Sequence, residues 1–403
     1  MEFDFTTVME RAGHDALALD AIGSPGGFAP AAPRAGFDVI PMWVADMNFP
    51  ACPSITRALS ARIAHPSFGY FEPREEYFRA IVDWQRARNG VRGMAPVHIG
   101  YENGVLGGVV SALRAFAAPG DPVLVHSPTY IGFTKSLQAN GFPIVHSPLR
   151  LDERGVWRMD FEDMERKLEE HRIHVAIFCS PHNPCGRVWE RAEIERAMDV
   201  YAAHDCVVVS DEIWSDIIRP GFAHVPTQSV SEDARRRTVA LYAPSKTFSL
   251  AGLVGSYHVI YDEYLRDRVR AQAAKSRYNE MNVLSMHALI GAYSEEGARW
   301  TDELRQVIAG NVDTVMDALG SRFKGVSAAL PQGTYMLFLD CAQWCAERDK
   351  TIEDVERAAW DVGVAVQDGR MFGGPTHLRM NVALPRVRVE EALDRLDRFV
   401  FNA

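Results

Sequence analysis

The chain has 403 residues, of which 47% are hydrophobic and 24% charged, and its formal net charge at neutral pH is −10. This hydrophobic content excludes an intrinsically disordered chain, and the length predicts two or three domains. An acidic surface repels the phosphates of nucleic acids. We therefore expect no nucleic-acid partner, and we expect any anionic ligand to be held by a local site.

The cysteines and the hydropathy pattern indicate the compartment. The six cysteines include no Cys-x-x-Cys pair, which predicts reduced thiols rather than a metal knuckle or a disulfide framework. The first residues, MEFDFTTVMERAG, are acidic and lack the apolar run of a secretory signal. The sequence contains no stretch of 18 consecutive apolar residues, so that it predicts no membrane span. We expect a cytoplasmic protein with no membrane partner.

Short apolar runs in the middle of the chain are typical of strands buried on both faces, because they are β-branched and almost free of polar residues. The predicted strands are Val123–His126, Ile144–His146, Val175–Cys179, Val207–Ser210 and Val239–Tyr242. Amphipathic stretches lie between them at 160–170, with Asp160 as a predicted helix cap, and at 192–204. The alternation predicts an α/β fold with a mostly parallel sheet covered by helices.

The pattern changes after about residue 290 to an α+β layout. The predicted elements there are a helix at 300–319, a strand at 334–339, a helix at 352–362, a strand at 378–382 and a helix at 389–399. We predict an N-terminal arm at 1–45 that is part of the small domain, a large domain at 46–290 and a small domain at 291–403. The Pro/Gly-rich stretch 23–36 is a predicted surface loop.

Four side chains follow the carboxyl ends of predicted strands, where ligands of α/β sheets usually bind. They are Tyr130 in SPTY, Asn183 in SPHNPCGRV, Asp211 in VVVSDEIWSD and Lys246 in YAPSKTFSLAG. Each has an ordinary explanation by itself: a core tyrosine, a turn-forming asparagine, a helix-capping aspartate and a solvated lysine. An acid at the end of an apolar strand is nevertheless costly unless a cation or a donor pairs with it.

Taken together and in this order, these strings resemble the fold-type I pyridoxal-phosphate (PLP) enzymes, the aspartate aminotransferase superfamily, from about Ile40 to Pro385. The resemblance implies a seven-stranded sheet in the large domain, PLP as cofactor and a homodimer with shared active sites. It implies that Lys246 is the Schiff-base lysine and, once released, the base that removes the substrate α-proton. It further implies that Asp211 pairs with the pyridine nitrogen, that Asn183 donates to the ring 3-oxygen and that Tyr130 stacks on the ring.

Two further segments match anion-binding positions of the same enzymes. The string ENGVLGG at 102–108 opens a predicted helix that runs to Phe116, and its glycines let backbone N–H groups approach an anion. A plain loop-to-helix junction explains this string equally well. The resemblance places the cofactor phosphate on Asn103, Gly104 and Val105, with Ser245 as a second contact. It also makes Tyr70, in SFGYFEP, a tyrosine that reaches the phosphate of the neighbouring subunit.

The substrate carboxylate needs a planar, charged fork, which only arginine provides. Arg379, in HLRMNVALPR, matches the arginine that binds the α-carboxylate of the amino-acid substrate. An arginine on an edge strand, which is where we place this one, is otherwise usually solvated.

Within the superfamily, the strings VIPMWVADMNF, FGY, APSKTFSLAGL and RMNVALPR are most similar to the cystathionine β-lyase, or C–S β-lyase, branch. These enzymes cleave the Cβ–S bond of cystathionine or cysteine conjugates and give a thiol, pyruvate and ammonia. The resemblance implies that the MWVADM stretch, with Ala45, lines the substrate mouth beside Lys246. A PLP-dependent aminotransferase is the alternative. A regulator that has this fold but no catalytic activity is a remote alternative, since Lys246 is intact and no room is left for a DNA-binding helix-turn-helix.

Three positions depart from the pattern. Val254 stands where many aminotransferases carry a phosphate-binding arginine. Trp214 stands where aminotransferases carry a tyrosine and the lyase branch often a histidine, and its indole can only donate a hydrogen bond to the ring 3-oxygen. Cys185 replaces the threonine of an N-P-T-G loop and is interpreted as a packing residue. These departures leave the choice between lyase and aminotransferase open.

Overall fold

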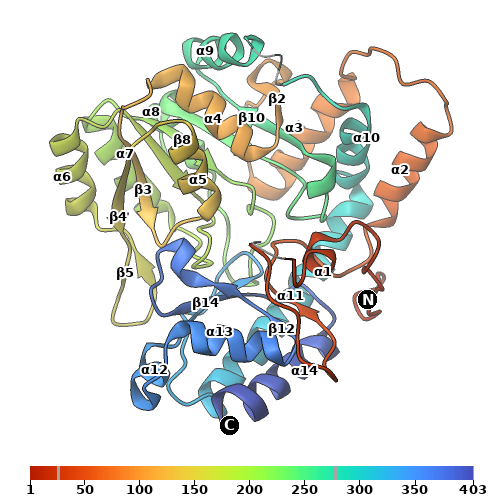
Figure 1. The fold of residues 1–403 in the computed structure, drawn as a ribbon. Coiled ribbons are helices and arrows are strands. Elements are labelled where there is room, and N and C mark those ends of the chain that lie inside the picture. Colours follow the sequence, from red (N-terminus) through yellow and green to blue (C-terminus); the bar gives the residue numbers. More distant parts are fainter. Residues whose placement is uncertain (25–27, 276, 278, 403) are drawn as a thin grey trace.

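A seven-stranded sheet forms the centre of the fold in the computed structural model, which describes residues 1–24, 28–275, 277 and 279–402 (Figure 1). Across the sheet the strands are β2 (Ile99–Asn103), β10 (Gly255–Val259), β9 (Thr238–Tyr242), β8 (Val207–Asp211), β7 (Val175–Cys179), β3 (Val123–Ser127) and β4 (Ile144–Pro148). The last five run parallel, whereas β10 is antiparallel to both of its neighbours. The predicted mostly parallel sheet is confirmed. The sequence pattern did not predict β2 and β10.

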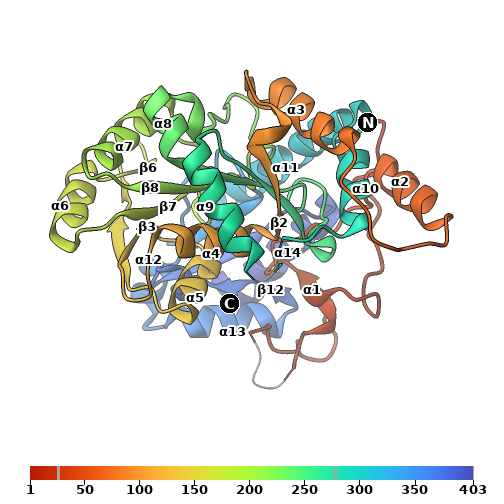
Figure 2. The same cartoon turned by 90° about the horizontal axis from the view of Figure 1, so that it is seen from above.

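Alternate residues of the parallel strands enter two different cores, as strands buried on both faces require. In β3, Val123 and Val125 pack with the helices of one face, while Leu124 packs with those of the other. The first face carries α4 (Val105–Phe116), α5 (Ile131–Ala139) and α9 (Glu263–Ala274); the second carries α6 (Phe161–His171), α7 (Arg191–Ala203) and α8 (Glu232–Arg237) (Figure 2). The sheet is therefore the middle of three layers.

Two helices between the strands agree with the sequence pattern. At the start of α6, the Asp160 side chain accepts a hydrogen bond from the backbone N–H of Asp163 at 3.1 Å, which confirms the predicted cap. The buried face of α7 consists of the predicted apolar residues Ile194, Ala197, Met198 and Tyr201. Three further helices, α2 (Pro53–Ile63), α3 (Glu75–Asn89) and α10 (Val283–Ala292), belong to a third core that includes residues of β9 and β10.

The C-terminal part lies beyond one end of the sheet (blue in Figure 1). After α11 (Glu295–Ser321) it has a three-stranded antiparallel sheet in the order β11 (Met336–Asp340), β14 (His377–Asn381), β13 (Gln367–Asp368). Its helices are α12 (Ala342–Arg348), α13 (Ile352–Asp361) and α14 (Arg386–Leu396), the last followed by a π-helical turn at Asp397–Phe401. The predicted α+β layout is confirmed, but the edge position that we expected for the strand of Arg379 is wrong, because β14 is the middle strand.

The N-terminal segment packs with this C-terminal part. Strand β1 (Ile40–Pro41) pairs in parallel with β12 (Val364–Ala365), and the Arg395 side chain donates to the Asp38 main-chain oxygen at 2.7 Å. The short helix α1 (Leu17–Asp20) precedes it. The exact domain boundaries after residues 45 and 290 stay a prediction.

A hairpin of β5 (Arg150–Leu151) and β6 (Trp157–Arg158) projects after β4. The predicted loop at 23–36 contains no helix or strand in its described residues; residues 25–27 lie outside the description. All six cysteines are buried and carry free thiols. Among the described residues, every helix is too short or too polar to span a bilayer.

Candidate active site

A cavity of about 190 Å³ lies at the carboxyl ends of the parallel strands. Residues that follow β3, β7, β8 and β9 converge there, because parallel strands end at the same edge of a sheet. The predicted site residues that line it are Ala45, Gly104, Val105, Tyr130, Asn183, Asp211, Trp214, Ser245 and Lys246. The other lining residues are Leu106, Cys179, Ile213, Ala251 and Val254. Most of the predicted site is thus brought together in one place.

Lys246 lies in the turn after β9, and its side-chain Nζ donates a hydrogen bond to the main-chain oxygen of Ala45 at 2.9 Å. Burial, and then the positive charge of Arg379, lower the pKa of Lys246 to about 8. The carboxylates of Asp46 and Asp211 oppose this shift. An amine that is partly neutral near pH 8 can act both as a nucleophile and as a base.

Asp211 is the last residue of β8, and its buried carboxyl group faces the cavity. Its Oδ1 accepts a hydrogen bond from the backbone N–H of Ile213 at 3.0 Å. Burial raises the pKa of Asp211 to about 7, although the Ile213 N–H and the charge of Lys246 act in the opposite direction. Such a carboxyl group is suited to a cation that a ligand brings, because the cation would stabilise its ionised form.

The adjacent acid, Glu212, does not line the cavity. Its carboxylate lies 2.7 Å from the Nε2 of His224 and accepts hydrogen bonds from the hydroxyls of Tyr242 and Ser210 and from the backbone N–H of Thr227. Burial alone would raise the pKa of Glu212, but these donors lower it below its usual value. Of the two neighbouring acids, only Asp211 is therefore available to a ligand.

Arg379 is buried on β14, with 4% of its surface exposed. Its Nη2 donates to the main-chain oxygen of Trp43 at 3.0 Å and to Oε1 of Gln367 at 2.5 Å. Its Nη1 donates to Oδ1 of Asn183 at 3.4 Å, and its Nε has no partner among the described residues. Burial lowers the pKa of Arg379 to about 10. Arg379 thus borders the cavity through Asn183 rather than lining it.

The segment at 42–47 is held over the cavity by the C-terminal part of the chain. The Asn381 amide donates to two of its main-chain oxygens, at 2.7 and 2.6 Å. The hydroxyl of Tyr335 donates to the Ala45 oxygen at 3.1 Å, and this oxygen also accepts from Lys246. Sequence reasoning missed Tyr335, because an aromatic residue inside the strand predicted at 334–339 is an ordinary core feature.

Two aromatic side chains form walls of the cavity. Tyr130 is half-buried at the start of α5, and a Cβ on Gly132 would lie 2.3 Å from its ring, so that the ring position requires a glycine there. Trp214 is buried, and the centre of its ring lies 5.7 Å from Nζ of Lys246. Its indole packs edge-on against Tyr335 at 4.6 Å between ring centres. Trp214 is therefore held by packing, and the ring of Tyr130 contacts Phe133 edge-on at 5.4 Å between ring centres.

The predicted anion-binding turn joins β2 to α4. Asn103 ends the strand, Gly104 has a φ of 82°, and the helix begins at Val105 and ends at Phe116 as predicted. The positive φ favours glycine, and the first N–H groups of a helix favour an anion. Val254 faces this turn with an apolar side chain: a Cβ added at Gly104 would lie 3.6 Å from its Cγ1.

Tyr70 lies in the loop between α2 and α3, which projects from the body of the protein at the upper right of Figure 1. Its side chain is fully exposed. In the single chain it does not line the cavity. The role that the resemblance assigned to it depends on a second subunit and stays a prediction.

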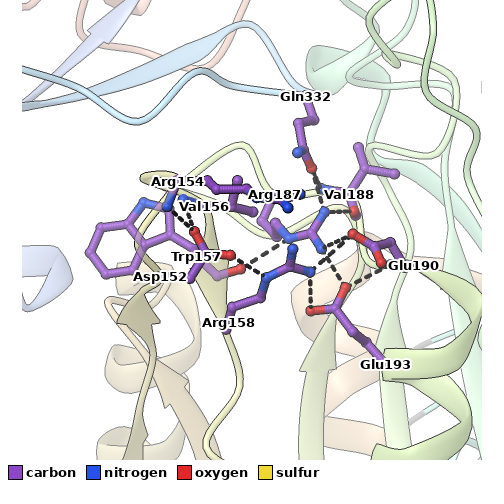
Figure 3. Close-up of polar contacts among 10 residues, drawn as sticks. All are labelled: Asp152, Arg154, Val156, Trp157, Arg158, Arg187, Val188, Glu190, Glu193 and Gln332. Atoms are coloured by element: carbon purple, nitrogen blue, oxygen red, sulfur yellow. Dashed lines mark hydrogen bonds and ion pairs between the residues drawn. The ribbon is translucent and has the colours of Figure 1, made fainter.

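The loop that carries Asn183 is fastened by a charged cluster that the sequence pattern did not reveal (Figure 3). Buried Arg187 forms ion pairs with Glu190 and Glu193 and donates to Oε1 of Gln332. The backbone N–H of Gln332 in turn donates to the Gly186 oxygen at 2.8 Å. Cys185 packs in the core of the same loop, and burial raises the pKa of its thiol, so that it remains a packing residue.

Residues 38–396 match the model of the family "Aminotransferase class I and II", and the chain belongs to this family. It is 34% identical over 361 residues to cystathionine β-lyase PatB of Bacillus subtilis. The matched region covers 89% of this chain and 92% of that protein. Its fold is similar to cystalysin from Treponema denticola, a structure that contains pyridoxal 5'-phosphate (TM-score 0.90, 29% identity, 99% and 98% of the two chains). It is also similar to the PLP-bound C–S lyase from Staphylococcus hominis (TM-score 0.89, 26% identity, 98% of each chain).

Proposed function

We propose that this protein is a PLP-dependent C–S β-lyase that cleaves the Cβ–S bond of cystathionine or cysteine conjugates to a thiol, pyruvate and ammonia. The observation that carries the proposal is one cavity in which the amine of Lys246 and the buried carboxyl of Asp211 meet, bordered by Arg379. The names of the relatives, a cystathionine β-lyase and a C–S lyase, support the reaction class.

The residues around the cavity fit PLP. Burial raises the pKa of Asp211 although Lys246 is near, and a protonated ring nitrogen would supply a cation that stabilises its ionised form. Lys246 offers an amine to the aldehyde, and the start of α4 at residues 103–105, with Ser245, offers donors to the phosphate. Tyr130 and Trp214 provide aromatic walls for the ring. Trp214 also offers its indole N–H, and Asn183 its amide N–H, to the ring 3-oxygen. PLP itself supplies an electron sink that stabilises negative charge on the substrate Cα.

The remaining work falls to side chains of this protein. Arg379 binds the substrate α-carboxylate with a buried positive charge. Lys246 takes the proton from Cα, for which its lowered pKa is suited at neutral to mildly basic pH. The segment with Ala45 borders the substrate beside Lys246 and closes that side against water.

An aminotransferase is the second candidate, because its reaction begins with the same removal of the α-proton. The two reactions differ in their later steps. Elimination expels the thiolate from Cβ and returns the cofactor to its aldehyde form, whereas transamination leaves the cofactor as an amine until a keto acid restores it.

Purified protein with cystathionine and no added keto acid is therefore expected to release many equivalents of pyruvate and free thiol per active site. Pyruvate and thiol, counted against bound cofactor, are the measurement. A parallel reaction with an amino acid that has no leaving group on Cβ is the control. If pyruvate formation stops near one equivalent per site and resumes when a keto acid is added, the protein is an aminotransferase. Absence of turnover on any amino acid would favour the regulator without catalytic activity.

We further propose a homodimer in which Tyr70 of each subunit completes the site of the other. A fully exposed tyrosine on a projecting loop is consistent with a partner contact. Tyr70→Phe is expected to weaken PLP retention in dialysis, because one hydroxyl donor to the phosphate is lost, and to leave the circular dichroism spectrum unchanged. The matched control is Phe68→Leu, a change on the same loop without a hydroxyl. A fully active monomer at micromolar concentration would contradict this proposal.

We also propose the cytoplasm as the compartment and a small-molecule amino acid as the substrate. Six buried free thiols are typical of proteins in a reducing compartment.

A further inference from the structure

Three arginines are buried among the described residues, Arg187, Arg266 and Arg379. Arg187 and Arg379 both lie next to the loop that carries Asn183, but they differ in their partners. Arg187, 3% exposed, forms ion pairs with two glutamates (Figure 3). Arg379, 4% exposed, has only neutral oxygen partners among the described residues: a main-chain carbonyl and the side-chain amides of Gln367 and Asn183. A buried cation without a carboxylate is unfavourable unless a ligand supplies the negative charge. Buried Arg266 on α9 also donates only to main-chain oxygens among the described residues, but it is not at the cavity. Arg379 borders the cavity, so that a ligand there can supply the negative charge that two glutamates supply to Arg187.

Gln367 is the partner whose identity decides this difference. It lies directly opposite Arg379 in the β13–β14 ladder, and opposite residues of antiparallel strands point to the same face. Its Oε1 is 2.5 Å from Nη2 of Arg379, the shortest of the three contacts. Glutamate has the same length and the same acceptor oxygen, so that a glutamate at 367 would keep the hydrogen bond and neutralise the charge.

The remaining contacts leave one side of the guanidinium toward the cavity. Gln367 and the Trp43 oxygen hold the Nη2 corner, and the ring of Phe372 covers one face at 4.4 Å from the guanidinium carbon to the ring centre. On the Nη1 side the contact to Asn183, which lines the cavity, is long at 3.4 Å. An incoming carboxylate can replace this weak contact without disturbing the Nη2 corner.

We propose that Gln367 is the positioning residue of the carboxylate site: it fixes Arg379 through a neutral oxygen, so that the positive charge stays available for the carboxylate of the ligand. This inference rests on the proposed function only in taking that ligand to be an amino acid. The same charge acts on the catalytic amine, since burial and then the charge of Arg379 lower the pKa of Lys246, with Asp46 and Asp211 opposing them. Tyr130 and Tyr335 are the titratable groups that face Arg379 itself.

The test compares Gln367→Glu, Gln367→Met and wild type, with propionate as a probe that has a carboxylate but no amine. Binding is measured on the holoenzyme by the change in cofactor absorbance. Gln367→Glu is expected to weaken propionate binding by about 10- to 100-fold, the range for charged hydrogen bonds. It is also expected to raise KM for the amino-acid substrate more than it lowers kcat. Gln367→Met removes the hydrogen bond but keeps the charge of Arg379, and is expected to weaken binding only a few-fold.

A second readout separates positioning from mere packing. With a carboxylate at 367, the pH at which the Lys246 nitrogen that carries the cofactor loses its proton, followed by cofactor absorbance, is expected to rise above the wild-type value, because the charge of Arg379 is neutralised. The matched control is Gln343→Glu, which introduces the same change on the exposed surface of α12 in the C-terminal part, and is expected to leave propionate binding unchanged. Thermal unfolding of each variant shows that it is folded.

Equal losses in the Glu and Met variants, or wild-type affinity in a folded Gln367→Glu protein, would overturn the inference. So would a wild-type protein that does not bind propionate. Failure of the proposed function has a different signature: propionate binds and responds to residue 367, but no amino acid is turned over.

Discussion

Lys246→Ala is expected to lower the rate of pyruvate formation from cystathionine by about 10³-fold or more, because loss of a general base alone accounts for about 10²- to 10⁴-fold. The same change removes the amine to which the cofactor attaches. The structure leaves no obvious substitute, since Lys246 is the only lysine among the residues lining the described cavity. The measurement is the initial rate of pyruvate and thiol release by protein reconstituted with PLP.

The matched variant for this experiment is Lys246→Arg, which keeps a positive charge beside Asp211 but cannot be deprotonated in a protein. It is expected to be as inactive as the alanine variant, so that charge and basicity are separated. In the wild type, borohydride reduction and peptide mapping should place the cofactor on Lys246. An adduct on a different lysine, or an active Lys246→Ala protein, would contradict the assignment.

Asp211→Asn is expected to weaken PLP retention by about 10²- to 10³-fold, because removing one partner of a buried ion pair typically costs about 3–5 kcal/mol. It is also expected to change the pH dependence. Burial raises the pKa of Asp211 to about 7 in the protein without PLP, and the protonated ring nitrogen binds its ionised form. Below pH 7 the carboxyl group must therefore lose a proton on binding, and wild-type affinity should fall by about tenfold per pH unit. Above pH 7 this contribution is constant.

The asparagine variant lacks this proton, so that this part of the slope should disappear. Ionisation of the PLP phosphate affects wild type and variant alike and cancels in the comparison. The control is Asp216→Asn: the pKa of Asp216 is also raised by burial, but its carboxyl group accepts hydrogen bonds from Trp84 and Thr247 and does not line the cavity. The measurement is the dissociation constant of PLP between pH 5.5 and pH 8.5. An unchanged slope in Asp211→Asn would refute the pairing.

Much of the fold could be predicted from local patterns. The apolar, β-branched runs became the five parallel strands. A strand buried on both faces needs apolar side chains at nearly every position, and this pattern can be recognised locally. The strands β2 and β10 could not be predicted in this way. Their buried His258 and Glu102 lie 2.7 Å apart, Nδ1 to Oε1, although 156 residues separate them in the chain. A polar residue looks like a surface residue until its distant partner is known.

In the candidate site, too, some features follow from local sequence patterns and others depend on residues distant in the chain. The sequence by itself determined which residues stand at the strand ends, because Tyr130, Asn183, Asp211 and Lys246 each follow a strand that the local pattern defines. Only the tertiary structure decided their electrostatics. The pKa of Lys246 and of Asp211, and the uncompensated charge of Arg379, arise from burial and from neighbours far away in the chain. Burial and distance are properties of the packed molecule, and no local pattern encodes them.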